Sequence, residues 1–289
     1  MSTVVAPPAE PSHAVLAGKR APRWLWALPP VAFVVVAVAY PLTGVVARTF
    51  TDKAERPAGL ATWRETLTDG AVLRALGTTI QVAALSTIGC LIAGTFLALV
   101  LAYVPFPGAP AVVRLIEVVV SFPSFLIPLA LGVLLGPVGV INAAITPLGL
   151  STGAFSTSLW GVVLAEIAFY TPFVVRPVLA AFGQLPAAQI NVASSLGAAP
   201  ARIVARVILP AAYPALVAAA SLTFLLTLNE FGIVLFTGAK DVITLPMLVY
   251  TRSIVGQDFA SAAVLATVQL ILSVGAYLLY RSFTRQEAH

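Results

Sequence analysis

Long stretches without a charged residue constrain this chain more than any other feature. Residues 75–113 contain no Lys, Arg, Asp or Glu, and Trp24–Ala47 is likewise uncharged. Only 9% of the residues are charged and 60% are hydrophobic, whereas about a quarter of the residues in a soluble domain are charged. So few charges cannot cover a water-facing surface. The sequence therefore argues against a soluble enzyme and predicts an all-α, polytopic membrane protein.

Hydropathy predicts six membrane-spanning helices, because each needs about 20 mostly apolar residues. The first is interpreted as an uncleaved helix, since its apolar run exceeds the roughly 7–15 residues of a signal-peptide core. The predicted spans are Trp24–Ala47, Gly77–Tyr103, Val112–Leu135, Leu159–Phe182, Ala212–Phe236 and Ala260–Phe283. The expected organisation is a disordered cytoplasmic tail at 1–22, a transmembrane domain at 23–283 and a short cytoplasmic tail at 284–289.

The connections and their charges suggest an orientation. With both termini inside, nine Lys and Arg residues lie inside and seven outside, so the positive-inside rule favours cytoplasmic N- and C-termini. Residues 51–75 and 238–259 then form solvated external loops. Residues 136–158 are uncharged and rich in Gly, Pro, Ser and Thr, which is compatible with a segment that dips into the interface. The net charge of +5 is attributed to this cytoplasmic Lys and Arg excess rather than to nucleic-acid binding.

The sequence lacks the residues that several kinds of catalytic, metal-binding and nucleotide-binding site require. Cys90 is the single cysteine, so neither a disulfide framework nor a thiolate metal cluster is expected. Both histidines, His13 and His289, lie in the tails, away from any intramembrane site. The chain has no G-x-x-x-x-G-K-[ST] phosphate loop, and Lys19, Lys53 and Lys240 lie in other contexts. We expect no enzymatic activity, no cofactor and no metal site.

Residues 183–210 form an unusual connection between the fourth and fifth spans. Pro186 is placed to begin a short helix, and Gly197 to end it in the left-handed conformation. A second helix restarts near Pro200, with Arg202 and Arg206 on one face and an apolar stripe on another. The pattern predicts a helix–glycine–helix elbow that docks a soluble partner by the helix-in-groove mode.

The segment Asn191–Pro210 resembles the cytoplasmic signature of ATP-binding-cassette importer permeases, E-A-A, three residues, G, nine residues, I-x-L-P. Four residues fall on its fixed positions, Val207 replaces the isoleucine, and Asn191 and Val192 replace the glutamate and the first alanine. Asn191 leaves no carboxylate for an ion pair with the ATPase. The positions assigned to the ATPase-coupling elbow are Asn191, Ala193, Gly197, Arg202, Arg206, Val207, Leu209 and Pro210.

The resemblance covers roughly residues 77–281 and implies the MetI-like six-helix core of binding-protein-dependent importers in the bacterial cytoplasmic membrane. It implies four partners: an ABC ATPase dimer, a second permease subunit (identical or homologous), an extracytoplasmic substrate-binding protein and the lipid bilayer. In such a system the ATPase drives alternating access, and the permease forms half of the translocation pathway.

Polar residues inside the spans are candidates for function. The resemblance implies that the fifth span lines the pathway, so Thr223, Thr227, Asn229 and Glu230 are the candidate translocation residues. Helix–helix hydrogen bonding is the other role for them, and the sequence slightly favours it over direct contact with the cargo. Glu117 is expected to pair with Arg114 or Arg176, and no role is assigned to Glu166. The prolines at 123, 128, 172 and 177 permit kinks in the third and fourth spans.

The cargo is suggested by resemblance alone. The segments 229–232 and 238–246 look most like permeases of 2-aminoethylphosphonate importers, and the Glu-Phe-Gly part also resembles sulfate and molybdate permeases. A carboxylate at Glu230 suits a cargo that carries an amine. Iron(III), thiamine and polyamine importers remain open, as does a different class of protein, an ATPase-independent channel or structural membrane subunit.

Overall fold

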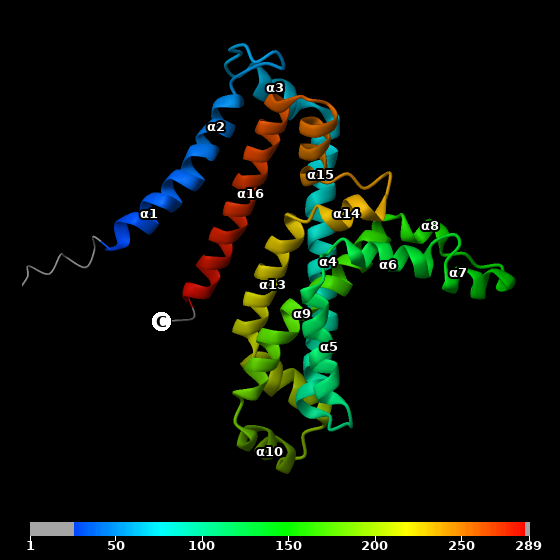
Figure 1. The fold of residues 1–289 in the computed structure, drawn as a ribbon. Helices are drawn as coiled ribbons and strands as arrows, with labels where there is room; N and C mark the ends of the chain where they lie inside the picture. The colour runs from blue at the N-terminus through cyan, green and yellow to red at the C-terminus, as the bar shows by residue number, and fades with distance from the viewer. Residues whose placement is uncertain (1–25, 287–289) are drawn as a thin grey trace, which may run out of the picture. The chain divides into compact units, whose positions relative to one another are not determined.

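The computed structural model describes residues 26–286, and this part of the chain is helical without a β-strand (Figure 1). The first ten elements are α1 (Leu28–Val34), η2 (Val35–Ala39), α2 (Tyr40–Arg48), α3 (Ala61–Thr68), α4 (Gly70–Tyr103), α5 (Ala109–Ser121), α6 (Leu126–Leu135), α7 (Val140–Ile145), η3 (Thr146–Leu148) and α8 (Gly153–Ser156). The remaining ones are α9 (Leu159–Gly183), α10 (Ala187–Ser195), α11 (Pro200–Ile203), η4 (Val204–Ile208), α12 (Leu209–Ala211), α13 (Tyr213–Leu228), α14 (Gly232–Thr237), α15 (Leu245–Tyr250), η5 (Thr251–Val255) and α16 (Phe259–Gln286).

The chain divides into two compact units, residues 1–45 and 46–289. In its described part the first unit is one apolar helical run, α1, η2 and most of α2, with no buried residue. The expected tail at 1–22 and His13 lie outside the described residues, as does His289. At the other end, α16 continues through Gln286, past the expected boundary at residue 283.

Five helical runs among the described residues are long and apolar enough to cross a membrane. A sixth is obtained when Pro200–Ala211 and Tyr213–Leu228, which meet at a bend of 70°, are taken as one span. The five are Leu28–Arg48, Gly70–Tyr103, Leu126–Leu148, Leu159–Gly183 and Phe259–Leu278. The number of spans, with the bent pair counted as one, agrees with the sequence prediction. The second span begins at Gly70, seven residues before the predicted Gly77, and the third and fifth spans differ more.

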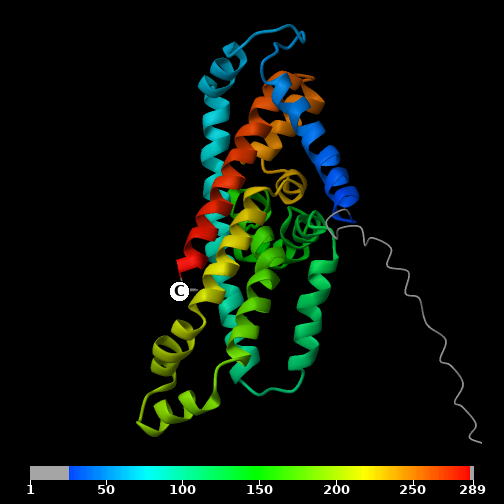
Figure 2. The same cartoon turned by 90° about the vertical axis from the view of Figure 1, so that its left-hand side faces the viewer.

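The third and fifth predicted spans are not continuous helices. The third is broken between α5 and α6, where Phe122 is extended ahead of Pro123, because a proline disfavours helical backbone in the residue before it. The fifth ends at Leu228 and restarts as α14 at Gly232. After these breaks α6 and α14 run across the direction of α5 and α13 (Figures 1 and 2). In contrast, α9 stays helical through Pro172 and Pro177.

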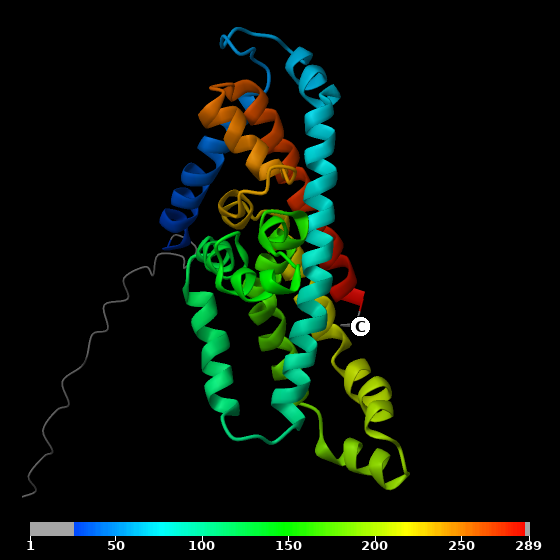
Figure 3. The same ribbon diagram turned by 90° about the vertical axis from the view of Figure 1, so that its right-hand side faces the viewer.

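Within the second unit, the ends of α4 define two opposite regions (Figures 2 and 3). At its start, Asp69 caps α4 by accepting a hydrogen bond from the Ala71 N–H at 2.8 Å, and α3 and the turn before α16 lie nearby. At its other end, the ring of Tyr103 packs 5.7 Å from that of Phe182 at the end of α9, where the elbow begins. The 183–210 elbow and the 49–69 segment therefore lie at opposite ends of this unit.

The core of the second unit is the packing of α4 against α9 and α13. Glycines let α4 and α9 approach closely: a Cβ added at Gly94 would lie 2.7 Å from Cβ of Val174 and 3.2 Å from the carbonyl oxygen of Thr171. Real Cβ contacts are not that short, so this part of α4 admits no side chain without a shift of α9.

Substitution of Gly94 by Ala is expected to lower the free energy of unfolding by about 1–3 kcal/mol, because the new methyl group must displace α9. Gly77→Ala on the same helix is the matched control. A Cβ at Gly77 meets nothing within 4 Å, so this change should raise stability by about 0.5–1 kcal/mol through helix propensity alone. Thermal unfolding of the two variants checks both signs, and equal shifts would contradict close α4–α9 packing at Gly94.

Candidate functional site

The elbow between α9 and α13 has the helix–glycine–helix form that the sequence predicts. Helix α10 ends where Gly197 takes φ +79°, a left-handed conformation that glycine adopts without strain. The N–H of Gly197 donates to the Ser194 carbonyl at 2.9 Å, and that of Ala198 donates to the Ala193 carbonyl at 3.1 Å. These bonds close the last turn of α10 and fix the angle at which α11 departs.

The elbow has one face packed on the core and one free face. Ile203 and Ile208 are buried, and Val207 packs against the same core cluster, which confirms the predicted apolar stripe. On the free face, Val192 is 59% and Leu196 82% exposed, although both are apolar. In the sequence Val192 stands out only as a departure from the signature, and Leu196 not at all, because an exposed apolar side chain on a helix has no distinctive sequence signal. Asn191, Arg202 and Arg206 are also exposed, whereas Ala193 and Leu209 are partly covered and Pro210 is exposed.

Glu230 joins three separate parts of the second unit. Its carboxylate accepts hydrogen bonds from the Tyr170 hydroxyl on α9, from Ser124 Oγ at 3.2 Å and from the Ile233 N–H at 2.8 Å. Ser124 lies in the break between α5 and α6, and Glu230 itself lies in the break between α13 and α14. The carboxylate is only 8% exposed and thereby ties both breaks to α9.

The other three candidate translocation residues differ in their surroundings. Thr223 is fully buried and Thr227 nearly so, with the Thr227 hydroxyl 3.0 Å from the Thr223 carbonyl oxygen and 3.5 Å from that of Ala83 on α4. Asn229 is exposed; its side-chain oxygen accepts from Gln269 and Ser273 of α16, each at 3.0 Å. Asn229 also lines an open cavity of about 390 Å³, together with Phe231, Pro246, Val249, Tyr250, Ala266 and Gln269.

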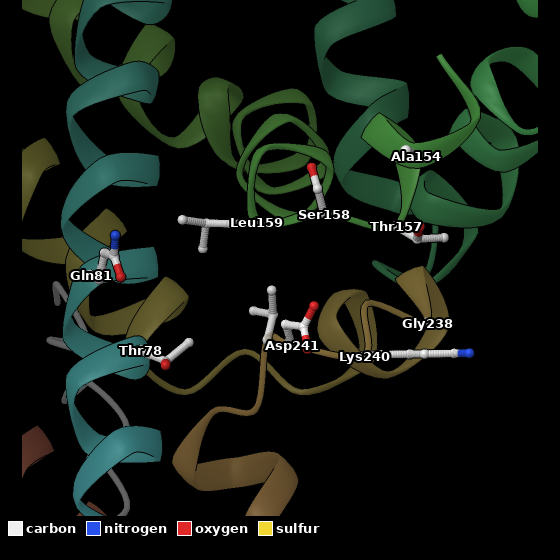
Figure 4. Close-up of a pocket in the computed structure, with 10 residues that line it drawn as sticks. Thr78, Gln81, Ala154, Thr157, Ser158, Leu159, Gly238, Lys240 and Asp241 are labelled. Carbon is white, nitrogen blue, oxygen red and sulfur yellow. The ribbon is translucent and has the colours of Figure 1, made fainter. Parts of the chain in front are cut away.

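A larger open cavity, of about 520 Å³, lies between α4, the start of α9 and the α14–α15 connection (Figure 4). Its polar lining comes from Thr78, Gln81, Ser158, Thr157, Lys240 and Asp241. Asp241 points toward Ser158, whereas the Lys240 side chain extends away from Gln81 (Figure 4). A neighbouring cavity of about 390 Å³ shares Thr78, Gln81 and Asp241 and adds Arg74. The sequence predicts a solvated external loop for Lys240 and Asp241 and includes them in the 238–246 segment that resembles 2-aminoethylphosphonate permeases, but neither prediction indicates a cavity.

An ion-pair network joins three elements at the end of the unit opposite the elbow. The Arg252 guanidinium in η5 donates to the Asp69 carboxylate at the start of α4, and it lies 3.9 Å from Asp258 ahead of α16. The Ala71 N–H, together with Arg252, holds the pKa of Asp69 below its ordinary value. The network holds together the start of α4, the η5 turn that follows α15, and the start of α16.

One predicted contact is not formed. Glu117 is exposed on α5 and makes no ion pair with Arg114, Arg176 or any other charged group between residues 26 and 286. Glu117, Arg114 and Arg176 are all exposed, so burial does not force any of them into a pair. Glu166, in contrast, is fully buried on α9, one turn from Tyr170.

Comparison with known proteins agrees with this arrangement. Residues 88–287 match the family of binding-protein-dependent transport system inner membrane components. PhnU of Salmonella typhimurium strain LT2, named for a 2-aminoethylphosphonate transport system, is 41% identical over 260 residues, 89% of this chain and 91% of that protein. The molybdenum transport system permease protein ModB of Mycobacterium tuberculosis is 32% identical over 88% of this chain and 94% of its own length.

The fold recurs in solved structures. A bacterial ABC transporter involved in alginate import contains a chain that superposes with a TM-score of 0.78 at 18% identity, over 91% of this chain and 94% of that one. A family match over most of the sequence, relatives aligned over almost their whole length and a shared helical fold all point the same way. The chain belongs to the binding-protein-dependent transport system inner membrane components, the permeases of ABC importers.

Proposed function

We propose that the chain is one of two permease subunits of an ATP-driven importer, and that the 183–210 elbow is its contact with the ATPase. The observation that carries this is the exposed apolar tip of the elbow, Val192 and Leu196, beside the basic Arg202 and Arg206. Apolar side chains that a folded chain leaves exposed at the end of a helical elbow suit insertion into a groove of a partner.

The elbow is built to transmit a displacement. Its inner face reaches the same core cluster as Phe182 and Val178 of α9, through Ile203 and Ile208. Beyond the 70° bend it continues into α13, which ends at the break that Glu230 ties to α9 and to Ser124. A displacement of the ATPase dimer would therefore be transmitted through packed helices, without a flexible linker, to the α5–α6 and α13–α14 breaks.

The remaining partners and the orientation belong to the same proposal. The elbow must face the cytoplasm to meet an ATPase, which gives the N-in and C-in arrangement. The opposite end, with the 49–69 segment and the α15–α16 turn, then faces outward and receives the extracytoplasmic binding protein. A second permease subunit, identical or homologous, completes the pathway. Among the fifth-span candidates, we assign Asn229 to the surface of the pathway. Thr223, Thr227 and Glu230 are assigned to contacts between the helices that line it.

We assign an aminophosphonate, with 2-aminoethylphosphonate as the leading member, as the cargo. The support is that the PhnU relatives are 41% identical over most of both chains, compared with 32% for the ModB relative. The carboxylate of Asp241, which lines the cavity between α4 and the α14–α15 connection, also suits the amine of such a cargo.

Uptake in proteoliposomes tests the cargo. The permease, its ATPase and its binding protein are reconstituted together, and ATP-dependent accumulation of labelled 2-aminoethylphosphonate is measured. We expect accumulation that requires both ATP and the binding protein, and no accumulation of ethylphosphonate, which lacks the amine. Import of molybdate in place of the aminophosphonate would overturn the cargo while keeping the importer. Cargo flux without ATP or an ATPase would indicate a channel and overturn both.

A further inference from the structure

Polar side chains follow one face of α4, in the half of that helix that lies away from the elbow. Arg74, Thr78 and Gln81 are spaced four and three residues apart, which places them on the same face. Leu73 and Ile80, both exposed, lie on a different face of the same turns. An exposed apolar face suits contact with lipid, whereas a face that carries a guanidinium and an amide requires water or a polar ligand.

This polar face lines two adjoining cavities. The cavity of about 520 Å³ and its neighbour of about 390 Å³ share Thr78, Gln81 and Asp241, and Arg74 lines the second. In Figure 4, Thr78 and Gln81 lie on α4 at one side of the first cavity, and Asp241 points toward Ser158 at the other. Both volumes lie in the range of roughly 300–1,000 Å³ that small-molecule sites occupy. The two cavities together are called the α4 groove below.

The connection between α14 and α15 is anchored on both sides of Asp241. Ala239 and Val242 are buried in an apolar cluster with side chains of α4, α9 and α14. The Leu245 N–H donates to Thr79 Oγ1 on α4 at 2.7 Å. Asp241 itself is exposed. Because its neighbours hold the connection against α4, the carboxylate of Asp241 is positioned at the groove although it is not buried.

Arg74 and Asp241 bring opposite charges to the α4 groove. Both side chains are exposed, and neither forms an ion pair with another group among residues 26–286. Lys240 also lines the first cavity, but its side chain extends away from Gln81 (Figure 4). The charges offered to a ligand of the groove are therefore one guanidinium and one carboxylate, which match a solute that carries both an anion and an amine.

We propose that the α4 groove binds the cargo during its passage and recognises an aminophosphonate by both of its charged ends. Asp241 accepts the ammonium group of the cargo. Arg74 binds the phosphonate, because the N–H donors of a guanidinium match the oxygens of such an anion, and Gln81 and Thr78 add hydrogen-bond donors beside it. The inference rests on the proposed importer function and adds a recognition site in the permease itself, separate from the binding protein.

Direct binding to the importer without its binding protein tests the site. The permease, its second subunit and the ATPase are purified together in lipid nanodiscs. Equilibrium binding of labelled 2-aminoethylphosphonate, ethylphosphonate and ethylamine is then measured. We expect saturable binding of 2-aminoethylphosphonate. Each of the other two solutes should bind at least about tenfold more weakly, since it can satisfy only one of the two charges.

Two neutral variants assign the two ends of the cargo. Asp241→Asn should weaken the binding of 2-aminoethylphosphonate and ethylamine roughly tenfold without weakening that of ethylphosphonate. Arg74→Gln should weaken the binding of 2-aminoethylphosphonate and ethylphosphonate by a similar factor without weakening that of ethylamine. Arg74→Lys keeps the positive charge and should recover part of the loss. Glu117→Gln, an exposed carboxylate on α5, is the matched control and should bind all three solutes like the wild type.

The same variants separate recognition from folding. Arg74 and Asp241 are exposed, so the Tm of each variant should equal that of the wild type. In proteoliposomes that contain the binding protein, ATP-dependent uptake of 2-aminoethylphosphonate should fall in both neutral variants and stay unchanged in Glu117→Gln.

Three results would overturn the site. They are a wild-type importer without saturable binding of 2-aminoethylphosphonate, binding that both neutral variants retain, and equal losses for all three solutes, which would indicate a change in the shape of the groove. Wild-type uptake that both variants retain would likewise remove the α4 groove from the pathway and leave the importer function intact. Failure of the wild type to take up 2-aminoethylphosphonate with its binding protein would instead overturn the cargo given under the proposed function.

Discussion

Replacement of Gly197 by Pro is expected to abolish import while leaving the membrane helices folded. Proline fixes φ near −65° and has no N–H, whereas Gly197 has φ +79° and its N–H donates to Ser194. The elbow must therefore take another path, which moves Val192 and Leu196 away from the position in which the ATPase would meet them. We expect ATP-dependent uptake to fall at least about a hundredfold, as for misplacement of a rigid coupling element. We also expect that the ATPase no longer co-purifies with the variant permease.

A graded series controls for this change. Nothing lies within 4 Å of a Cβ built at Gly197, so backbone conformation, and not space, decides the outcome. Asn tolerates the left-handed region and should preserve most of the uptake, whereas Ala should cost about 1 kcal/mol and reduce it partially. An order of activity other than Gly, Asn, Ala, Pro would contradict the role of this turn. Retention of the ATPase by the Pro variant would contradict the elbow as the docking site.

Replacement of Glu230 by Ala is expected to be the most destabilising single change in the second unit. It leaves the Tyr170 hydroxyl, Ser124 Oγ and the Ile233 N–H without their acceptor, and it releases both helix breaks from α9. Each buried donor that is left without an acceptor costs about 1–3 kcal/mol. Thermal unfolding of the reconstituted permease should show this loss, and uptake should fall with it.

Two further variants distinguish this role from contact with cargo. Tyr170→Phe removes one donor and should cost about 1–3 kcal/mol, and its effect should be largely absent when Glu230 is already Ala, because the two side chains share one bond. Glu230→Gln should lower stability without changing the preference between charged and neutral solutes. A Gln variant of native stability with altered cargo preference would instead assign Glu230 to the pathway.

The features that could be predicted from the sequence are those determined by residues close to one another along the chain. The elbow was predictable because its determinants are local: Pro186 and Pro200 begin helices, and Gly197 supplies the turn between them. The run Leu159–Gly183 was predictable within a residue or two, because an uninterrupted apolar segment of the right length has one favourable structure in a bilayer.

The break in the fifth span was not predicted, and for the third span the sequence predicted only that Pro123 permits a kink, because hydropathy averages over both breaks. Residues 122–125 and 229–231 are flanked by apolar sequence, and the signals they contain, Pro123 and the Asn229–Glu230 pair, also occur in continuous spans. The hydrogen bonds that stabilise the breaks join residues 60 and 106 positions apart in the chain. Contacts of that range cannot be read from periodicity, so Ser124 and Tyr170 were missed as partners of Glu230.

The unequal lengths of the core helices set a requirement on the surrounding lipid. Helix α4 has 34 residues and, at 1.5 Å per residue, extends about 51 Å, whereas α13 has 16 residues and extends about 24 Å. A hydrocarbon layer is about 30 Å thick, so α4 protrudes from it and α13 cannot cross it alone. The acyl chains beside α13 must thin locally or meet the crosswise α14. Thickness of the host membrane therefore acts on this protein chiefly at the fifth span, where the transported solute is expected to pass.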